Sequence, residues 1–180
     1  GGVTLPGVSE EGVVAEDAGT VQTIGTRFAH DLISLDYAAS MGCAACGSPG
    51  GGCQFLGTAA TAQVVAEALG MALPGSATAP AVSAERRRFA EATGTEAVRL
   101  AGRGTAPAAV MDARAVRNAL RVLLAVGGST NGIVHLTAIA GRLGMAVDLE
   151  AVDAMARETP VLVNLKPSGA HYMEHLHAAG

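Results

Sequence analysis

The sequence predicts a predominantly helical segment of an α/β domain whose sheet lies largely outside the chain. Over most of the 180 residues, apolar positions recur at three- and four-residue steps, the period of one helix face. Residues 161–165 form the one short apolar run that favours a strand. An α/β domain alternates strands with helices, so many helices beside one strand indicate one part of a larger domain.

The first half of the chain alternates helices with glycine-rich segments. Residues 1–12 are predicted to form a loop, and 15–33 a helix with Val21, Ile24, Phe28 and Leu32 on its apolar face. A short helix over 35–42 precedes a turn over 43–56, where Pro49 and four glycines disfavour regular structure. The next predicted elements are a helix over 57–69 and a loop over 71–83.

The second half is predicted to be almost entirely helical. An Arg-rich helix covers 84–102 with an interruption at Gly94, and Asp112 is a suitable N-cap for a helix ending at Gly127-Gly128. Further helices are predicted over 129–144, 148–159 and from about residue 170. His135, on an otherwise apolar helix, is expected to be a hydrogen-bonded core residue.

Composition excludes several classes of function. Hydrophobic residues make up 49% of the chain, enough for a core, and the formal net charge of −4 argues against nucleic acid as the main partner. No segment resembles a signal peptide, and no apolar run approaches the roughly 18 residues of a membrane span. Three cysteines without a secretion signal favour free thiols or metal ligation and a cytoplasmic protein.

All three cysteines, Cys43, Cys46 and Cys53, fall in the turn over 43–56. A thiolate is a good ligand for iron or zinc, and Cys53 stands just before a helix, where N–H groups carry partial positive charge. The spacing also allows a redox CxxC motif, a zinc site without its fourth ligand, or buried thiols that fill small gaps. The turn lacks the Lys-Ser/Thr of a phosphate-binding loop.

A second group of polar residues, Ser129, Thr130 and Asn131, follows Gly127-Gly128 at a helix start. Such a start can bind a substrate carboxylate through N–H groups and hydroxyls, or the same side chains can simply cap the helix. His171 and His175 share a helix face, but the order of a zinc-protease motif is absent, and a solvated face is the simpler interpretation.

Two long motifs resemble the dihydroxy-acid and phosphogluconate dehydratase family. Residues 48–77 read SPGGGCQFLGTAATAQVVAEALGMALPGSA, similar to the family's Pro-Gly-x-Gly/Thr-Cys turn and its Glu-Ala-Leu-Gly-x-x-Leu-Pro-Gly. Residues 125–174 read AVGGSTNGIVHLTAIAGRLGMAVDLEAVDAMARETPVLVNLKPSGAHYME, similar to the family's Gly-Gly-Ser-Thr-Asn helix and its later Pro-Ser-Gly. The resemblance covers nearly the whole chain and identifies residues 1–180 as part of the amino-terminal α/β domain.

The resemblance implies a hydro-lyase that removes water from a 2,3-dihydroxy carboxylate or an aldonic (sugar) acid to give a 2-oxo acid, in amino-acid biosynthesis or sugar-acid metabolism. It implies an iron–sulfur cluster (2Fe-2S or 4Fe-4S) acting as Lewis acid, with Cys53 as one metal ligand, and a nearby Mg²⁺. Ser129, Thr130 and Asn131 become substrate-binding candidates, and the full-length form is expected to be a homo-oligomer.

The same resemblance places the other cluster cysteines and the Mg²⁺ ligands upstream of Gly1, and the catalytic serine beyond Gly180. No catalytic residue is therefore assigned, and we expect the 180-residue chain alone to be inactive. The alternative is a small non-enzymatic helical metal-binding module that uses Cys43, Cys46 and Cys53. The motifs lean toward a sugar acid around Cys53 and toward the branched-chain enzyme around LKPSG, so the substrate stays open at this point.

Overall fold

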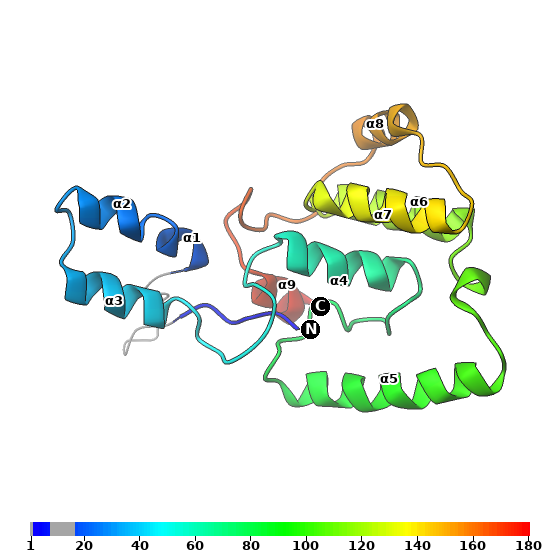
Figure 1. Ribbon diagram of the computed structural model, residues 1–180, viewed down its shortest axis with the longest axis horizontal. Coiled ribbons are helices and arrows are strands. Elements are labelled where there is room, and N and C mark those ends of the chain that lie inside the picture. The colour runs from blue at the N-terminus through cyan, green and yellow to red at the C-terminus, as the bar shows by residue number, and fades with distance from the viewer. Residues whose placement is uncertain (1, 8–16) are drawn as a thin grey trace.

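A computed structural model describes residues 2–7 and 17–180 (Figure 1). Its helices are α1 (Ala18–Val21), α2 (Ile24–Ala29), α3 (Leu35–Ala44), α4 (Thr58–Ala68), α5 (Ala84–Gly102), the 3-10 helix η1 (Pro107–Ala109), α6 (Ala113–Ala125), α7 (Asn131–Arg142), α8 (Leu149–Glu158) and α9 (Met173–Ala179). The helices α1 to α3 form one lobe, α4 and α6 to α8 form a second, and α9 lies between them beside both chain ends.

The predominantly helical prediction is confirmed, whereas this chain does not confirm the α/β class. Residues 2–7 and 17–180 contain isolated β-bridges but no strand, so the strand predicted over 161–165 is wrong. Its chain turns back at once: Lys166 N donates to His171 O at 2.7 Å and His171 N donates to Asn164 O at 3.0 Å. The carbonyl of Asn164 and the N–H of Lys166 are therefore paired within this turn, and neither is available to a partner strand.

The main hydrophobic core lies between α4, α6, α7 and α8. Its buried residues are Val65, Leu69, Val116, Ala119, Leu120, Leu123, Leu136, Ala140 and Val152. Those on α6 follow the three- and four-residue steps of one helix face, as predicted. Asp112 caps α6 as expected, because its carboxylate accepts from the N–H groups of Arg114 and Ala115.

A second core joins segments far apart in the sequence. Val3, Leu56, Ala60, Leu165 and Met173 form one buried cluster, and Val3 and Met173 have no exposed surface. The amino-terminal segment thus packs with the start of α4 and with the turn that precedes α9 (Figure 1). One of its members, Leu56, belongs to the loop that carries Cys53.

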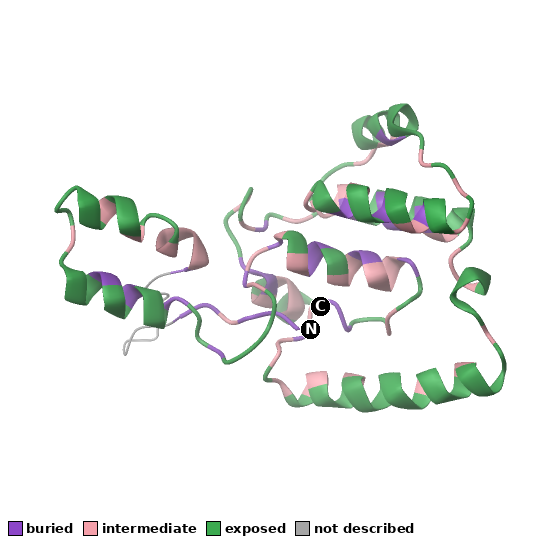
Figure 2. Ribbon diagram, in the orientation of Figure 1, coloured by how far each residue is buried: buried purple, intermediate pink, exposed green. Residues whose placement is uncertain are grey.

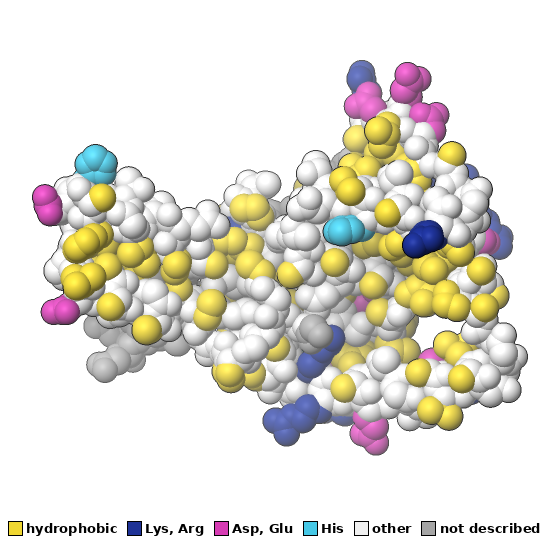
Figure 3. Space-filling model, in the orientation of Figure 1, with side chains coloured by type: hydrophobic (Ala, Val, Ile, Leu, Met, Phe, Trp, Pro, Cys, Tyr) yellow, Lys and Arg dark blue, Asp and Glu magenta, His cyan; other side chains and the backbone are white. Residues whose placement is uncertain are grey.

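Two parts of the fold have few buried residues. Figure 2 shows α5 as mostly exposed, and none of its residues is buried. Apolar side chains gather over the α2–α3 pair in Figure 3, where Phe28 and Leu35 are 45% and 66% exposed. On the apolar face predicted for residues 15–33, Val21 and Ile24 are partly buried, whereas Phe28 and Leu32 are exposed.

Several predicted boundaries need correction. The described part of the helix predicted over 15–33 forms two short helices, because a turn at residues 22–23 separates α1 from α2. Cys43 lies in the last turn of α3 and not in the glycine-rich turn. The helix α5 passes through Gly94 without interruption, and His135 is exposed on α7 instead of buried. The loop predicted for residues 1–12 falls partly outside the described residues.

Among residues 2–7 and 17–180, no helix combines the length and the apolar character that crossing a membrane requires.

The core predicts a large cost for truncating Leu123, which is 2% exposed. Leu123→Ala should lower the free energy of unfolding by about 2–5 kcal/mol, because it removes apolar contacts and leaves a cavity. Val134→Ala, on a side chain that is 65% exposed, should change it by less than about 0.5 kcal/mol. Urea denaturation of both variants measures the difference, and equal values would contradict this description of the core.

Candidate functional site

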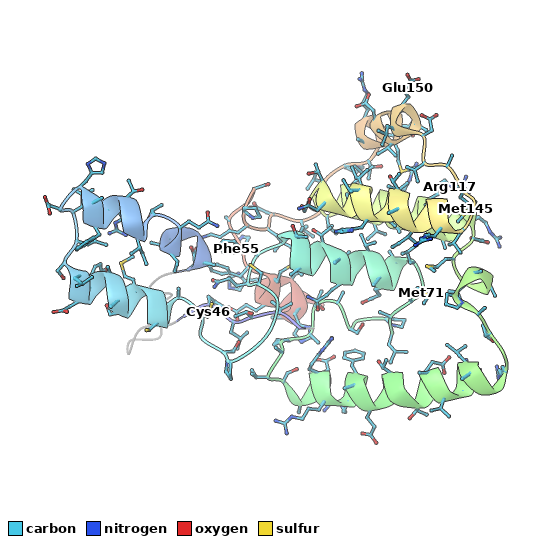
Figure 4. All side chains as sticks on the ribbon, viewed as in Figure 1. Cys46, Phe55, Met71, Arg117, Met145 and Glu150 are labelled. Carbon is cyan, nitrogen blue, oxygen red and sulfur yellow. The ribbon has the colours of Figure 1, made fainter. Side chains whose placement is uncertain are left out.

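The cysteine-containing loop runs from Ala45 to the start of α4. Cys43 and Cys46 are exposed, Cys53 is partly exposed, and all three are free thiols. In Figure 4, Cys46 lies just beyond α3, and Phe55 lies between α1 and the first turn of α4. Cys53 is partly exposed and belongs to neither hydrophobic cluster.

The amino-terminal segment supports this loop through backbone hydrogen bonds. Thr4 N donates to Cys53 O at 3.2 Å, and Gly52 N donates to Gly2 O at 2.9 Å. A Cβ at Gly51 would lie 2.5 Å from Thr4 Oγ1, and Gly51 has a φ of +95°. Side chains larger than hydrogen are therefore excluded there by both contact and backbone conformation, which explains the glycines before Cys53.

Residues 54–56 are held from two directions. Gln54 is buried, and its side-chain Nε2 donates to Ala45 O at 2.9 Å. Its backbone carbonyl accepts from Met173 N at 3.0 Å. Leu56 N donates to Lys166 O at 2.8 Å. Between these anchors, Phe55 N donates to Cys53 Sγ at 3.4 Å. The sulfur of Cys53 therefore accepts a backbone N–H, an arrangement known to stabilise metal-bound thiolates.

A partly buried ion pair between Asp17 and Lys166 lies beside this loop. Lys166 Nζ donates to Asp17 Oδ2 and, at 3.2 Å, to the hydroxyl of Tyr172, which itself donates to Asp17 Oδ2 at 2.8 Å. The other carboxylate oxygen of Asp17 caps α1 by accepting from Gly19 N and Thr20 N. Asp17 thus links α1 to the turn before α9.

Three pKa shifts describe the charge state of this network. Burial opposes ionisation of Asp17, but hydrogen bonds from Lys166, Tyr172 and Thr20 outweigh burial and lower its pKa to about 2. The hydrogen bond to Asp17 raises the pKa of Lys166. Burial, together with the bond to Asp17, raises the pKa of Tyr172. At neutral pH the network therefore holds a carboxylate, an ammonium and a neutral phenol.

The second predicted site, at the start of α7, meets the start of α4. Ser129 N donates to Thr61 Oγ1 at 2.9 Å, and Asn131 Nδ2 donates to Thr58 Oγ1 at 2.8 Å. The hydroxyls of Thr58 and Ser129 lie 3.5 Å apart. Since α4 begins a few residues after Cys53, the structure brings the two sequence-predicted sites to one region.

Thr130 occupies the N-cap position of α7 without a side-chain cap hydrogen bond, while Ser129 Oγ accepts from Asn131 N at 3.3 Å. Helix capping therefore accounts for part of the role of Ser129. It does not account for the contact of Asn131 with Thr58, which joins two helices.

Sequence reasoning missed three residues of this region. The sequence patterns single out none of Thr58, Lys166 and Tyr172 as a site residue. One signal was available: Lys166 is the single lysine among 12 basic Lys and Arg residues. Nothing local to Asp17 indicates its partner, which lies 149 positions away.

One cavity of the described part lies beside the site, and another lies away from it. A groove of about 500 Å³, mostly apolar, begins at Thr58 and passes between α4 and α7 toward Met111. A cavity of about 540 Å³ lies between the end of α4, α5 and η1, near Met71, which Figure 4 labels, and Leu100. The second cavity touches none of the predicted site residues.

Metal ligation by this chain alone finds no support in the geometry. Within residues 2–7 and 17–180, no three His, Cys, Asp or Glu side chains come together as a metal site. The three-cysteine module is therefore not favoured. Cys53 is fit to be a single ligand, since the residue is partly exposed and its sulfur accepts an N–H.

The chain is similar to known dehydratases along its whole length. Residues 1–180 match the family described as dihydroxy-acid/6-phosphogluconate dehydratase, N-terminal. The D-xylonate dehydratase YagF of Escherichia coli is 47% identical over 96% of this chain and 26% of its own length. The dihydroxy-acid dehydratase of Thermodesulfovibrio yellowstonii is 47% identical over 75% of this chain and 25% of its own length. The dihydroxy-acid dehydratase of Nitratidesulfovibrio vulgaris is 39% identical over 99% of this chain and 31% of its own length.

The low pKa of Asp17 predicts an acid-sensitive contribution to stability. A carboxyl with a folded pKa of about 2 against an ordinary 3.8 stabilises the fold by roughly 2 kcal/mol above pH 4. This contribution is lost as the pH falls from about 4 through 2. Asp17→Asn should therefore be less stable than wild type at pH 7, and the gap should close in acid.

Urea denaturation between pH 7 and pH 2 measures this gap. Asp153→Asn is the matched control, since Asp153 forms an exposed pair with Arg157 and should show little difference at any pH. A gap for Asp17→Asn that stays constant with pH would show that Asp17 does not act through its charge.

Proposed function

The chain belongs to the dihydroxy-acid/6-phosphogluconate dehydratase family, and from this membership we propose that the whole protein is a hydro-lyase acting on a hydroxylated carboxylic acid. The reaction removes water from a 2,3-dihydroxy carboxylate or a sugar acid and yields a 2-oxo acid. The chain spans about a quarter of the length of the relatives first compared. Residues 1–180 are thus proposed as part of an amino-terminal domain, and the catalytic groups lie elsewhere in the protein.

One observation carries the proposal: the loop of Cys53 and the start of α7 adjoin through Thr58 and Asn131. Cys53, the proposed metal ligand, lies a few residues before α4, and the start of α4 contacts the hydroxyl and amide groups at the start of α7. A hydroxy acid offers one hydroxyl to a metal and other polar groups to hydrogen-bonding side chains. The arrangement therefore suits a substrate held between Cys53 and the Ser129–Asn131 segment.

We assign Cys53 as one ligand of an iron–sulfur cluster, of the 2Fe-2S or 4Fe-4S type, with its other ligands outside this chain. The cluster would supply a Lewis acid for the leaving hydroxyl, which is otherwise a poor leaving group. This chain supplies the thiolate, the N–H of Phe55 that stabilises it, and the rigid loop that orients both. Mg²⁺, held by ligands elsewhere, and a homo-oligomeric, cytoplasmic protein stay part of the proposal.

We favour a sugar acid as the substrate class. The D-xylonate dehydratase YagF matches 96% of the chain at 47% identity, whereas a dihydroxy-acid dehydratase at the same identity matches only 75%. A dihydroxy-acid dehydratase that matches 99% is 39% identical. Turnover of D-xylonate and of a branched 2,3-dihydroxy carboxylate by the full-length protein tests this choice, and preference for the branched acid would overturn it.

Replacing Cys53 tests the metal assignment. Cys53→Ser in the full-length protein should abolish the visible absorbance of the cluster and lower bound iron, because one of its few thiolate ligands is lost. Cys43→Ser and Cys46→Ser are matched controls, since both thiols are exposed and outside the proposed set, and both should keep the cluster. A cluster that survives Cys53→Ser but not Cys43→Ser would contradict the assignment.

Replacing Asn131 tests the substrate contact. Asn131→Ala removes an amide at the junction of α4 and α7, and loss of one hydrogen bond should weaken substrate binding by about tenfold. The expected result is a higher KM, measured in steady-state assays of the full-length protein with its cluster intact. Thr137→Ala, two turns along α7, is the control and should leave KM unchanged. An unchanged KM for Asn131→Ala would remove this residue from the site.

A further inference from the structure

The network of Asp17, Lys166 and Tyr172 is not used by the proposed reaction, yet its three side chains are largely buried and hydrogen-bonded to one another. The side chains of Asp17 and Lys166 are 9% and 31% exposed, and Tyr172 is 7% exposed. Bringing such charges together out of water is costly unless each is well paired. The question is therefore what this network holds in place.

Lys166 contacts the Cys53 loop through its backbone and its side chain. Its carbonyl accepts from Leu56 N at 2.8 Å. Its ammonium lies 5.7 Å from the centre of the Phe55 ring and 4.8 Å from that of Tyr172. These distances are within reach of a cation–π attraction.

Tyr172 also contacts the Phe55 ring. The two rings stack with centres 5.9 Å apart and planes 17° apart. The next residue, Met173, donates its N–H to Gln54 O at 3.0 Å. Phe55 is therefore held by its ring and by the backbone on both sides, and every one of these contacts comes from residues 166–173.

The held residue is the one that bonds the thiol. Phe55 N donates to Cys53 Sγ at 3.4 Å, so the orientation of the Phe55 peptide sets this bond. Phe55 itself makes no hydrogen bond to the network, and the ring contacts are what connect the two.

We propose that Lys166 is a positioning residue for Cys53: its ammonium, anchored by Asp17 and Tyr172, holds Phe55 so that the Phe55 N–H bonds the sulfur. Lys166 is less suited to bind a substrate anion, because its charge is already neutralised by Asp17. The inference goes beyond the proposed function and rests on it only where a cluster is measured. It adds a residue that acts through another residue, not by touching the reacting atoms.

Amide hydrogen exchange in the cluster-free full-length protein tests the positioning directly. Lys166→Met should speed exchange of the Phe55 and Leu56 amides by about tenfold, equivalent to about 1.4 kcal/mol of lost protection. Lys166→Arg, which keeps the charge beside Asp17, should recover part of this protection. Arg157→Met is the matched control, since it removes a cation from an exposed pair on α8, and it should leave these amides unchanged.

The reduction potential and spectrum of the cluster in the loaded protein give a second measurement. The ammonium and the N–H bond to sulfur both favour the more negative reduced form of the cluster. Removing the ammonium and weakening this bond should therefore lower the reduction potential. Lys166→Met should show this shift, Lys166→Arg a smaller one and Arg157→Met none. A residue with a merely structural role would leave the potential of the folded protein unchanged.

Tyr172→Phe guards against a variant that fails to fold. It removes only the hydroxyl shared by Asp17 and Lys166, keeps the stacked ring, and should show the same changes at smaller size. If either Lys166→Met or Tyr172→Phe keeps a native circular dichroism spectrum and shows wild-type exchange at Phe55 and Leu56, the proposal is overturned. A wild-type protein that assembles no cluster would sink the proposed function, while the exchange measurement would still decide the role of Lys166.

Discussion

The loop that carries Cys53 depends on hydrogen bonds supplied by distant parts of the chain. Between Ala45 and Thr58 the backbone belongs to no helix, so buried N–H and C=O groups need partners elsewhere. Gly2 and Thr4 supply partners from one end of the chain, and Lys166 and Met173 supply them from the other. This constraint explains why residues 2–7 and 164–173, both without long elements, pack against the start of α4.

The same constraint gives the ion pair a structural reason. A buried salt bridge is weak evidence of stability in itself, because desolvation offsets much of the attraction. Here Asp17 uses one carboxylate oxygen to cap α1 and the other to bind Lys166 and Tyr172. One buried carboxylate thus fixes the position of a helix relative to a turn, and that turn holds the loop. The network therefore fixes how α1 lies relative to this turn, in addition to the stabilisation that the low pKa of Asp17 provides.

Local patterns predicted the helices well where a core face and a cap coincide. The helix α6, with Asp112 at its start and four buried positions on one face, was predicted because both signals lie within a few residues. The strand prediction for 161–165 was wrong because an apolar run is also compatible with an irregular segment. Here the segment leads into a turn, in which Lys166 N donates to His171 O and His171 N donates to Asn164 O. The helix α5 runs through Gly94 because one glycine inside a helix costs only about 1 kcal/mol relative to alanine and does not by itself end the helix.

The candidate site divides in the same way. Cys53 and the Ser129–Asn131 segment are candidates from the sequence alone because their motifs are local and resemble a known family. That Asn131 reaches Thr58, or that Asp17 reaches Lys166, follows only from packing between segments more than 70 residues apart. No periodicity in one sequence carries that information, so the residues that join the two motifs could not be predicted.

The main core also determines how the two helix starts meet. A Cβ at Gly132 would lie 2.3 Å from Leu123 Cδ1 and 2.9 Å from Thr61 Cγ2, so α7 approaches α4 and α6 as closely as a glycine allows. At this separation Thr61 Oγ1 reaches Ser129 N, and Thr58 Oγ1 reaches Asn131 Nδ2. A wider spacing would break both bonds while leaving the helices intact. The polar junction near Cys53 is therefore a consequence of apolar packing one turn deeper, and changes in that packing act on the site without touching it.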